Sequence, residues 1–177
     1  MRLQLITICL GAASAVPLIT STPPVPSTLN LTAIGAANGE STLECWRLDP
    51  LVSSSTPGTA GALALFLGGM ANATYTVLPP RFDGGLHNAP ALQLVLFSTG
   101  LIHITLPNCT EEAWIQGGKY GLIIAADTPD KSAHGHRTEY PGNAATIGLQ
   151  VPLKNGTKLK HGLLHGGPCT EDEITGF

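Results

Sequence analysis

Residues 86–108 read LHNAPALQLVLFSTGLIHITLPN and contain the clearest β-pattern in the chain. Two apolar runs, ALQLVLF and LIHITL, are separated by Ser98–Gly100, a glycine-ended turn of the length that joins neighbouring antiparallel strands. The sequence therefore predicts a β-hairpin. Because side chains alternate between the two faces of a strand, one regular strand through the first half of this stretch places His87 and Gln93 on the same face.

Short apolar runs recur through the rest of the chain, separated by Gly, Pro, Asn or Asp: TYTVLP, YGLIIAA, HRTEY, TIGLQV and HGLLH. No segment repeats apolar residues with sustained helical spacing, and 21 glycines and 14 prolines interrupt the pattern. These features predict an all-β sandwich or barrel. A weak helix within residues 36–56 is a further expectation.

The N-terminal region indicates export. A short positive start precedes the apolar run LQLITICLGAASA, which ends in small residues, so we expect residues 1–15 to be a signal peptide. A leader rich in Pro, Ser and Thr should follow over 16–39, and a single barrel domain should occupy 40–177. The apolar runs are too short for a bilayer span, and the acidic tail lacks a lipid-anchor signal. We therefore expect a secreted protein with no membrane partner.

The charge of the chain argues against nucleic acid as a partner. Charged residues make up 12% of the sequence and the formal net charge is −3. Proteins that bind nucleic acid neutralise phosphates with clustered Lys and Arg, and no basic stripe is present. We therefore expect the chemistry to lie in a pocket that takes a small organic molecule or a sugar.

Three cysteines remain after removal of the signal peptide, and thiols tend to pair in an oxidising compartment. Cys45 and Cys169 flank the domain, whereas Cys109 lies in a turn, so we predict a Cys45–Cys169 disulfide. Pairings of Cys109 with either partner remain open. Four glycosylation sequons, each expected on a surface loop or turn, begin at Asn30, Asn72, Asn108 and Asn155.

A second polar segment, HGHRTEY, could face the same cavity as the first. Residues of one parity are His134, His136, Thr138 and Tyr140, and they alternate with Arg137 and Glu139. We expect Asp127, Glu139 and Tyr140 to be strand-end or loop residues and Trp46 and Trp114 to be packing aromatics. His103, His161 and His165 receive no assignment.

The spacing in these two segments resembles that of the cupins, in particular the small secreted cupin-domain proteins of fungi. In HNAPALQLVLFSTG, His87 matches the first histidine of the first cupin motif, Ala89 replaces the second, and Gln93 stands at the glutamate position. Gly100 follows at the motif's glycine position. The stretch QGGKYGLIIAADTPDKSAHGHRTEY resembles the second motif, with His136 at the ligand position.

The resemblance covers roughly residues 60–165 and implies a cupin-like double-stranded β-helix, or jelly-roll barrel, with a pocket at its mouth and often a homodimer. It also implies a divalent metal ion held by His87, Gln93 and His136. A complete cupin centre has three imidazoles and a carboxylate, so the glutamine should weaken metal binding. His134 could supply a third nitrogen.

Three functions remain open. In the first, His87 and His136 transfer protons in an isomerase or cyclase while Gln93 orients the substrate. In the second, the same residues hold the metal of a cupin-type oxygenase. In the third, the protein is a non-catalytic secreted binding module.

Overall fold

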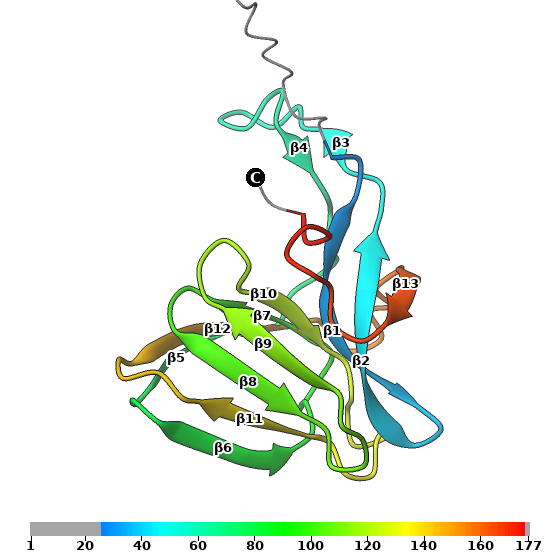
Figure 1. Cartoon of the computed structure of the whole chain (residues 1–177). Coiled ribbons are helices and arrows are strands. Elements are labelled where there is room, and N and C mark those ends of the chain that lie inside the picture. The colour runs from blue at the N-terminus through cyan, green and yellow to red at the C-terminus, as the bar shows by residue number, and fades with distance from the viewer. Residues whose placement is uncertain (1–25, 176–177) are drawn as a thin grey trace, which may run out of the picture.

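The computed structural model describes residues 26–175, which form β-strands and no helix (Figure 1). The predicted all-β class is therefore confirmed, and the helix expected within 36–56 is wrong. The predicted signal peptide, residues 1–15, lies outside the described residues. No helix in the described part is long and apolar enough to cross a membrane.

Two sheets build the body of the molecule. The larger has the spatial order β13 (Gly162–Gly166), β2 (Glu40–Leu48), β1 (Leu29–Ala37), β10 (Leu122–Ala125), β7 (Gln93–Phe97), β12 (Thr146–Pro152) and β5 (Thr74–Leu78). The smaller has the order β6 (Phe82–His87), β11 (His136–Tyr140), β8 (Leu101–Thr105) and β9 (Glu112–Gln116). A short ribbon pairs β3 (Val52–Ser53) with β4 (Leu63–Ala64). Strands pair antiparallel except β1 with β10.

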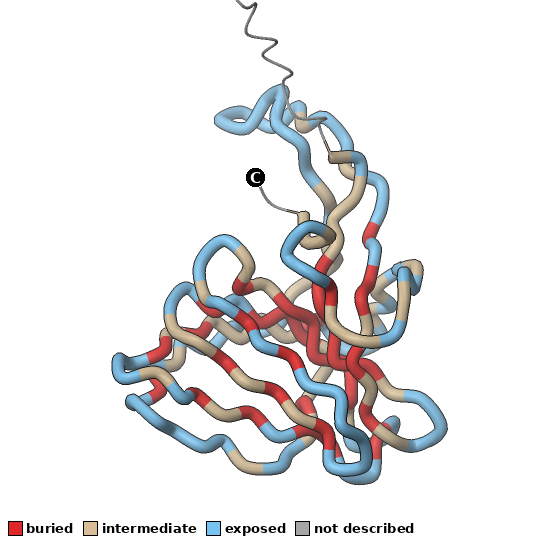
Figure 2. Tube along the Cα trace, in the orientation of Figure 1, coloured by how far each residue is buried: buried red, intermediate tan, exposed pale blue. Residues whose placement is uncertain are grey.

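The main hydrophobic core lies between the two sheets. Phe97 and Ile123 of the larger sheet belong to one buried cluster with Ile102, Ile104 and Ile115 of the smaller sheet. Figure 2 shows buried residues concentrated where the sheets face each other, while the β3–β4 end is mostly exposed. The arrangement is a β-sandwich, in which inward side chains of both layers exclude water.

The larger sheet is also covered on its other face. Leu31, Trp46 and Ile124 form a second buried cluster, and Leu65 and Leu159 pack against it from the connecting segments. Because both faces of β1 and β10 are covered, these central strands have nearly continuous apolar sequences, as expected for strands that are buried on both sides.

The first hairpin begins earlier in the chain than the sequence pattern predicted. Strand β1 starts at Leu29 and pairs with β2 across a two-residue turn at Asn38-Gly39, where both residues have positive φ, 53° and 83°. Asn-Gly favours this turn because both residues adopt the left-handed conformation readily. Residues 29–39 therefore belong to the fold, and the expected leader boundary at residue 40 is wrong.

The predicted hairpin within residues 86–108 does not form. Strand β7 has partners on both sides, β10 and β12, while β8 pairs with β9 and β11 in the other sheet. The turn at Ser98–Gly100 instead carries the chain from one layer to the other. Gly100 has a φ of 91°, and a Cβ there would lie 2.0 Å from Thr146 Oγ1, so the crossing requires glycine.

The predicted disulfide is confirmed. Cys45 of β2 is bonded to Cys169, across 124 residues of sequence, while Cys109 is free and exposed. A buried disulfide of this kind is typical of exported proteins.

The sequons occupy different environments. Asn72, Asn108 and Asn155 are exposed and lie outside the strands. Asn30 instead lies within β1, where its Nδ2 donates a hydrogen bond of 3.0 Å to the carbonyl oxygen of Glu173. The expectation that each sequon marks a loop is therefore wrong for Asn30.

Candidate functional site

A pocket of about 370 Å³ opens between the two sheets. Its lining residues are Ile34, Thr74, His87, Ala89, Pro90, Gln93, Val95, Phe97, Ile104, Ile123, Ala125, His136, Thr138, Tyr140, Gln150 and Pro152. The three residues singled out from the sequence, His87, Gln93 and His136, are all among them. The structure thus brings together residues from β6, β7 and β11.

His87 and His136 lie side by side on neighbouring strands. They are register partners of β6 and β11, and their ring centroids are 4.6 Å apart. Gln93 reaches the pocket from the opposite layer, because β6 and β7 belong to different sheets. The prediction that one regular strand carries both His87 and Gln93 is therefore wrong, although both residues line the same pocket. The alternation predicted for His136, Thr138 and Tyr140 is confirmed, since all three are buried.

His136 is oriented by a buried carboxylate. Its Nδ1 lies 2.7 Å from Oδ2 of Asp127, and the side chains are 5% and 0% exposed. An ionised carboxylate can only accept, so the imidazole carries its proton on Nδ1 and its lone pair on Nε2. Among the described residues, the bond from Nδ1 to Asp127 is the one hydrogen bond of the imidazole, so Nε2 has no partner. The basic nitrogen is therefore available to a molecule in the pocket.

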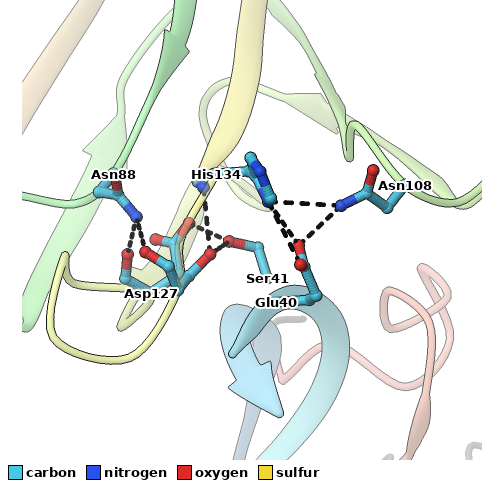
Figure 3. A network of polar contacts seen from close by, with 8 residues as sticks. Glu40, Ser41, Asn88, Asn108, Asp127 and His134 are labelled. Atoms are coloured by element: carbon cyan, nitrogen blue, oxygen red, sulfur yellow. Dashed lines mark hydrogen bonds and ion pairs between the residues drawn. The ribbon is translucent and has the colours of Figure 1, made fainter. Parts of the chain in front are cut away.

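Several hydrogen bonds hold Asp127 in place. Ser41 Oγ donates to Oδ2 at 2.7 Å, and the Ala89 N–H approaches Oδ1 at 3.4 Å. Asn88 Nδ2 donates to the carbonyl oxygens of Asp127 and Ser132, at 3.0 and 2.9 Å (Figure 3). These contacts join the loop between β10 and β11 to distant parts of the chain, so Asp127 is a rigid support for the histidine.

Asp127 lies in a loop just after a strand end, as expected, but its role as the buried support of His136 was not predicted. It is fully buried and follows the strand β10 by two residues. The available sequence signal was the position of an acidic residue directly after the apolar run LIIAA, because a buried strand end brings the next side chain into the interior. That signal indicates burial but does not reveal the partner His136.

His87 lies at the mouth of the pocket. Its Nδ1 donates to the carbonyl oxygen of Gly85 at 2.9 Å, which leaves Nε2 as the basic nitrogen. The residue is exposed, whereas His136 is buried. The two imidazoles therefore present the same tautomer in different environments, one accessible to water and one shielded from it.

Tyr140 places a phenol in the same pocket. It is the last residue of β11, as expected for a strand-end residue, but its side chain is only 9% exposed. Burial raises the pKa of Tyr140 to about 12, because the phenolate would be poorly solvated. The hydroxyl therefore keeps its proton at neutral pH and can donate a hydrogen bond to a ligand.

The pocket does not fit a cupin-type metal centre. It offers two imidazoles and the amides of Gln93 and Gln150, and none of its lining residues is Asp, Glu or Cys. A strongly bound divalent ion requires more imidazole or carboxylate ligands than this set provides. His134 does not add a nitrogen, because it is exposed and pairs with Glu40 at 3.0 Å. The prediction that His134 supplies a third imidazole is therefore wrong.

Another group of metal-ligand side chains lies at the disulfide. Ligand atoms of Cys45, His165 and Glu173 are within 4.8 Å of one another, the one such group in the described part of the chain. The Cys45 sulfur is already bonded to Cys169, and His165 Nε2 lies 3.0 Å from Glu173 Oε1. Hydrogen bonds to the Gly166 carbonyl and to Glu173 raise the pKa of His165. This arrangement favours a protonated imidazole over a bound ion.

The other histidines have structural partners. His103 stacks on Trp114 with centroids 4.0 Å apart and lies 2.8 Å from Glu112 on the outer side of the smaller sheet. His161 stacks on Trp46 at 3.5 Å. Trp46 is buried, as expected for a packing aromatic, whereas Trp114 is 52% exposed. Neither of these histidines lines the pocket.

The chain matches no protein-family model and no curated protein. Its function must therefore be argued from the pocket itself.

Proposed function

We propose that this protein is an enzyme of the isomerase or cyclase type that moves a proton on a small organic molecule bound between its two sheets. The buried pair of His136 and Asp127 is the observation that supports this proposal. A carboxylate on Nδ1 fixes the imidazole with its lone pair on Nε2 and stabilises the imidazolium that forms when Nε2 takes a proton.

The reaction begins at a carbon atom next to a carbonyl group. His136 Nε2 removes the proton, and the electron pair of the broken C–H bond moves toward the carbonyl oxygen. Gln93, which also lines the pocket, orients the substrate through its amide. The proton then passes from the His136 imidazolium to the unprotonated Nε2 of His87, whose ring centroid is 4.6 Å from that of His136, and His87 delivers it at a neighbouring position. General acid–base catalysis of this kind contributes about 10²- to 10⁴-fold to a rate.

The cupin-like jelly-roll barrel and the homodimer remain part of the proposal on the strength of the motif spacing. Secretion is supported by the pattern of the first 15 residues and by the disulfide. The cupin-type oxygenase receives less support, because the pocket provides two imidazoles and no carboxylate. A binding module without catalysis is the remaining alternative.

Deuterium uptake tests the proposal without knowledge of the substrate. A panel of small ketones, lactones and reducing sugars is incubated with the protein in D₂O, and the loss of proton signals next to each carbonyl is followed by NMR. We expect the wild type to accelerate exchange for some members, and His136→Gln to lose at least about 100-fold of that acceleration. His134→Gln is the matched control, because this exposed histidine pairs with Glu40 outside the pocket.

The outcomes separate the candidate functions. Equal exchange by wild type and His136→Gln contradicts the proposal. Wild-type protein that binds panel members but exchanges none of them supports the binding module. Exchange that disappears with a chelator and returns with added metal supports the oxygenase-type centre instead.

A further inference from the structure

The pocket contains no formally charged lining residue. Its polar lining residues are Thr74, His87, Gln93, His136, Thr138, Tyr140 and Gln150, and the others are apolar. No Lys or Arg among them could pair with a carboxylate or phosphate. The buried carboxylate of Asp127 lies behind His136 and would repel an anion. Placing a charged group in such a site is costly, so the chemistry of the lining selects for an uncharged ligand.

Tyr140 has an unused hydrogen-bond donor in this pocket. Tyr140 is 9% exposed and lines the pocket, and its hydroxyl makes no hydrogen bond with another side chain or the backbone among residues 26–175. The hydroxyl is therefore free to donate to a molecule that enters the pocket. A ligand oxygen would supply the acceptor.

Gly84 of β6 lies close to both Tyr140 and His87. A Cβ at Gly84 would lie 3.0 Å from the Thr138 carbonyl oxygen, 3.8 Å from His87 Cε1 and 3.9 Å from Tyr140 Cε2. The two ring atoms are therefore no more than about 8 Å apart. Tyr140 and both histidines line the same pocket, so one ligand can contact the phenol and an imidazole together.

We infer that the substrate of this pocket is an uncharged carbonyl compound whose oxygen accepts a hydrogen bond from Tyr140. The inference rests on the proposed function and specifies its substrate class. When an imidazole removes the proton, the C–H electron pair forms a carbon–carbon double bond and the carbonyl pair moves onto oxygen. Tyr140 stabilises that enolate oxygen, and return of the proton to another carbon completes an isomerisation with no net oxidation.

The pKa of about 12 for Tyr140 agrees with this role, because the phenol remains a donor instead of ionising when negative charge develops beside it. Tyr140 is thus a catalytic residue in the literal sense that it contacts the reacting oxygen. Gln93 and Gln150 also line the pocket and can donate through Nε2, so they can orient other polar atoms of the ligand.

Three probes with one ring system test the inference by NMR titration of the labelled full chain: 2-acetylnaphthalene, 2-ethylnaphthalene and 2-naphthoate. The first carries a neutral carbonyl, the second lacks oxygen, and the third carries a charge. We expect the ketone to bind about three- to tenfold more tightly than the hydrocarbon, as one hydrogen bond allows. The carboxylate should bind at least about tenfold more weakly than the ketone.

Variants then locate the hydrogen bond. Tyr140→Phe should lower ketone affinity to that of the hydrocarbon and leave the hydrocarbon unchanged. Tyr75→Phe is the matched control, because Tyr75 is 64% exposed and lies outside the pocket. Tyr140→Phe keeps the ring and removes only an unpartnered hydroxyl, so its thermal midpoint should not fall below that of the wild type.

The inference is overturned if the carboxylate binds most tightly, or if Tyr140→Phe weakens all three probes equally or none. The one-ring series of acetophenone, ethylbenzene and benzoate is measured as well, in case the naphthalene ring is too large for the pocket. If neither acetophenone nor 2-acetylnaphthalene binds, the inference is also overturned. His136-dependent deuterium exchange that persists alongside any of these results would leave the proposed function standing while this inference fails.

Discussion

Replacing Asp127 by asparagine should change the tautomer of His136. The carboxylate accepts through Oδ2 from both Ser41 and His136, each at 2.7 Å. In the amide, one of the two positions becomes an NH₂ donor. If the NH₂ faces His136, the imidazole must accept through Nδ1 and carry its proton on Nε2, in the pocket. If the NH₂ instead takes the position of Oδ1, it faces the Ala89 N–H, which approaches Oδ1 at 3.4 Å in the wild type. Two donors would then face each other, which is unfavourable.

The cost to stability follows from the same contacts. Each hydrogen bond to a charged group contributes about 1.5–3 kcal/mol, compared with about 0.5–1.5 kcal/mol for a neutral pair. In Asp127→Asn, the bonds from Ser41 and from His136 no longer go to a charged group, and their donor and acceptor can exchange roles. The buried charge also disappears, which offsets part of the loss. We expect the free energy of unfolding to fall by about 1–3 kcal/mol, and His136-dependent exchange to fall by about 10²- to 10⁴-fold.

Long-range ¹H–¹⁵N NMR of the histidine side chains measures the tautomer directly, and urea denaturation measures stability. Ser41→Ala is the control, because it removes one donor to Asp127 but leaves the bond from His136. This variant should lose stability while keeping the Nδ1–H tautomer and most of the exchange activity. An Asp127→Asn protein that keeps the Nδ1–H tautomer, or that keeps full exchange activity after the tautomer has changed, would refute the reasoning.

Two further predictions concern the scaffold. The double variant Cys45→Ala/Cys169→Ala opens a link across 124 residues, and chain-entropy estimates give a loss of about 4–5 kcal/mol in urea unfolding; an unchanged midpoint would show that the disulfide adds nothing. Gly100→Ala should lose about 2–5 kcal/mol by the same measurement, because its Cβ would lie 2.0 Å from Thr146 Oγ1. Gly39→Ala, with a φ of 83° and nothing within 4 Å of its Cβ, should lose only about 1–2 kcal/mol; equal losses would contradict the close-contact argument.

The local pattern was enough to predict strands but not their partners. The run ALQLVLF forms β7 and the run LIHITL forms β8, yet they lie in different sheets. Alternation of side chains is a property of each strand alone, whereas pairing depends on residues far away in sequence. A short turn between two apolar runs therefore favours a hairpin but does not exclude a crossing between layers.

The strongest local signal for the first hairpin is the turn at residues 38–39. Asn38-Gly39 joins β1 to β2 as a two-residue hairpin turn, and both flanking segments contain alternating apolar residues. Recognition of this turn would have placed β1 inside the fold and removed the expected helix.

The sequence by itself determined the all-β class and the inward face of β11, because composition and strand period can be read without knowing which segments meet. It favoured the Cys45–Cys169 pair, and the structure decided it against the pairings with Cys109. Only the tertiary structure revealed the support of His136. Asp127 is bonded there to Ser41, which is 86 residues away, and the pair is buried between layers that the sequence does not place together. The residues around Asp127 in the sequence would be the same whether its carboxylate faced solvent or His136. Packing of distant segments decides between the two.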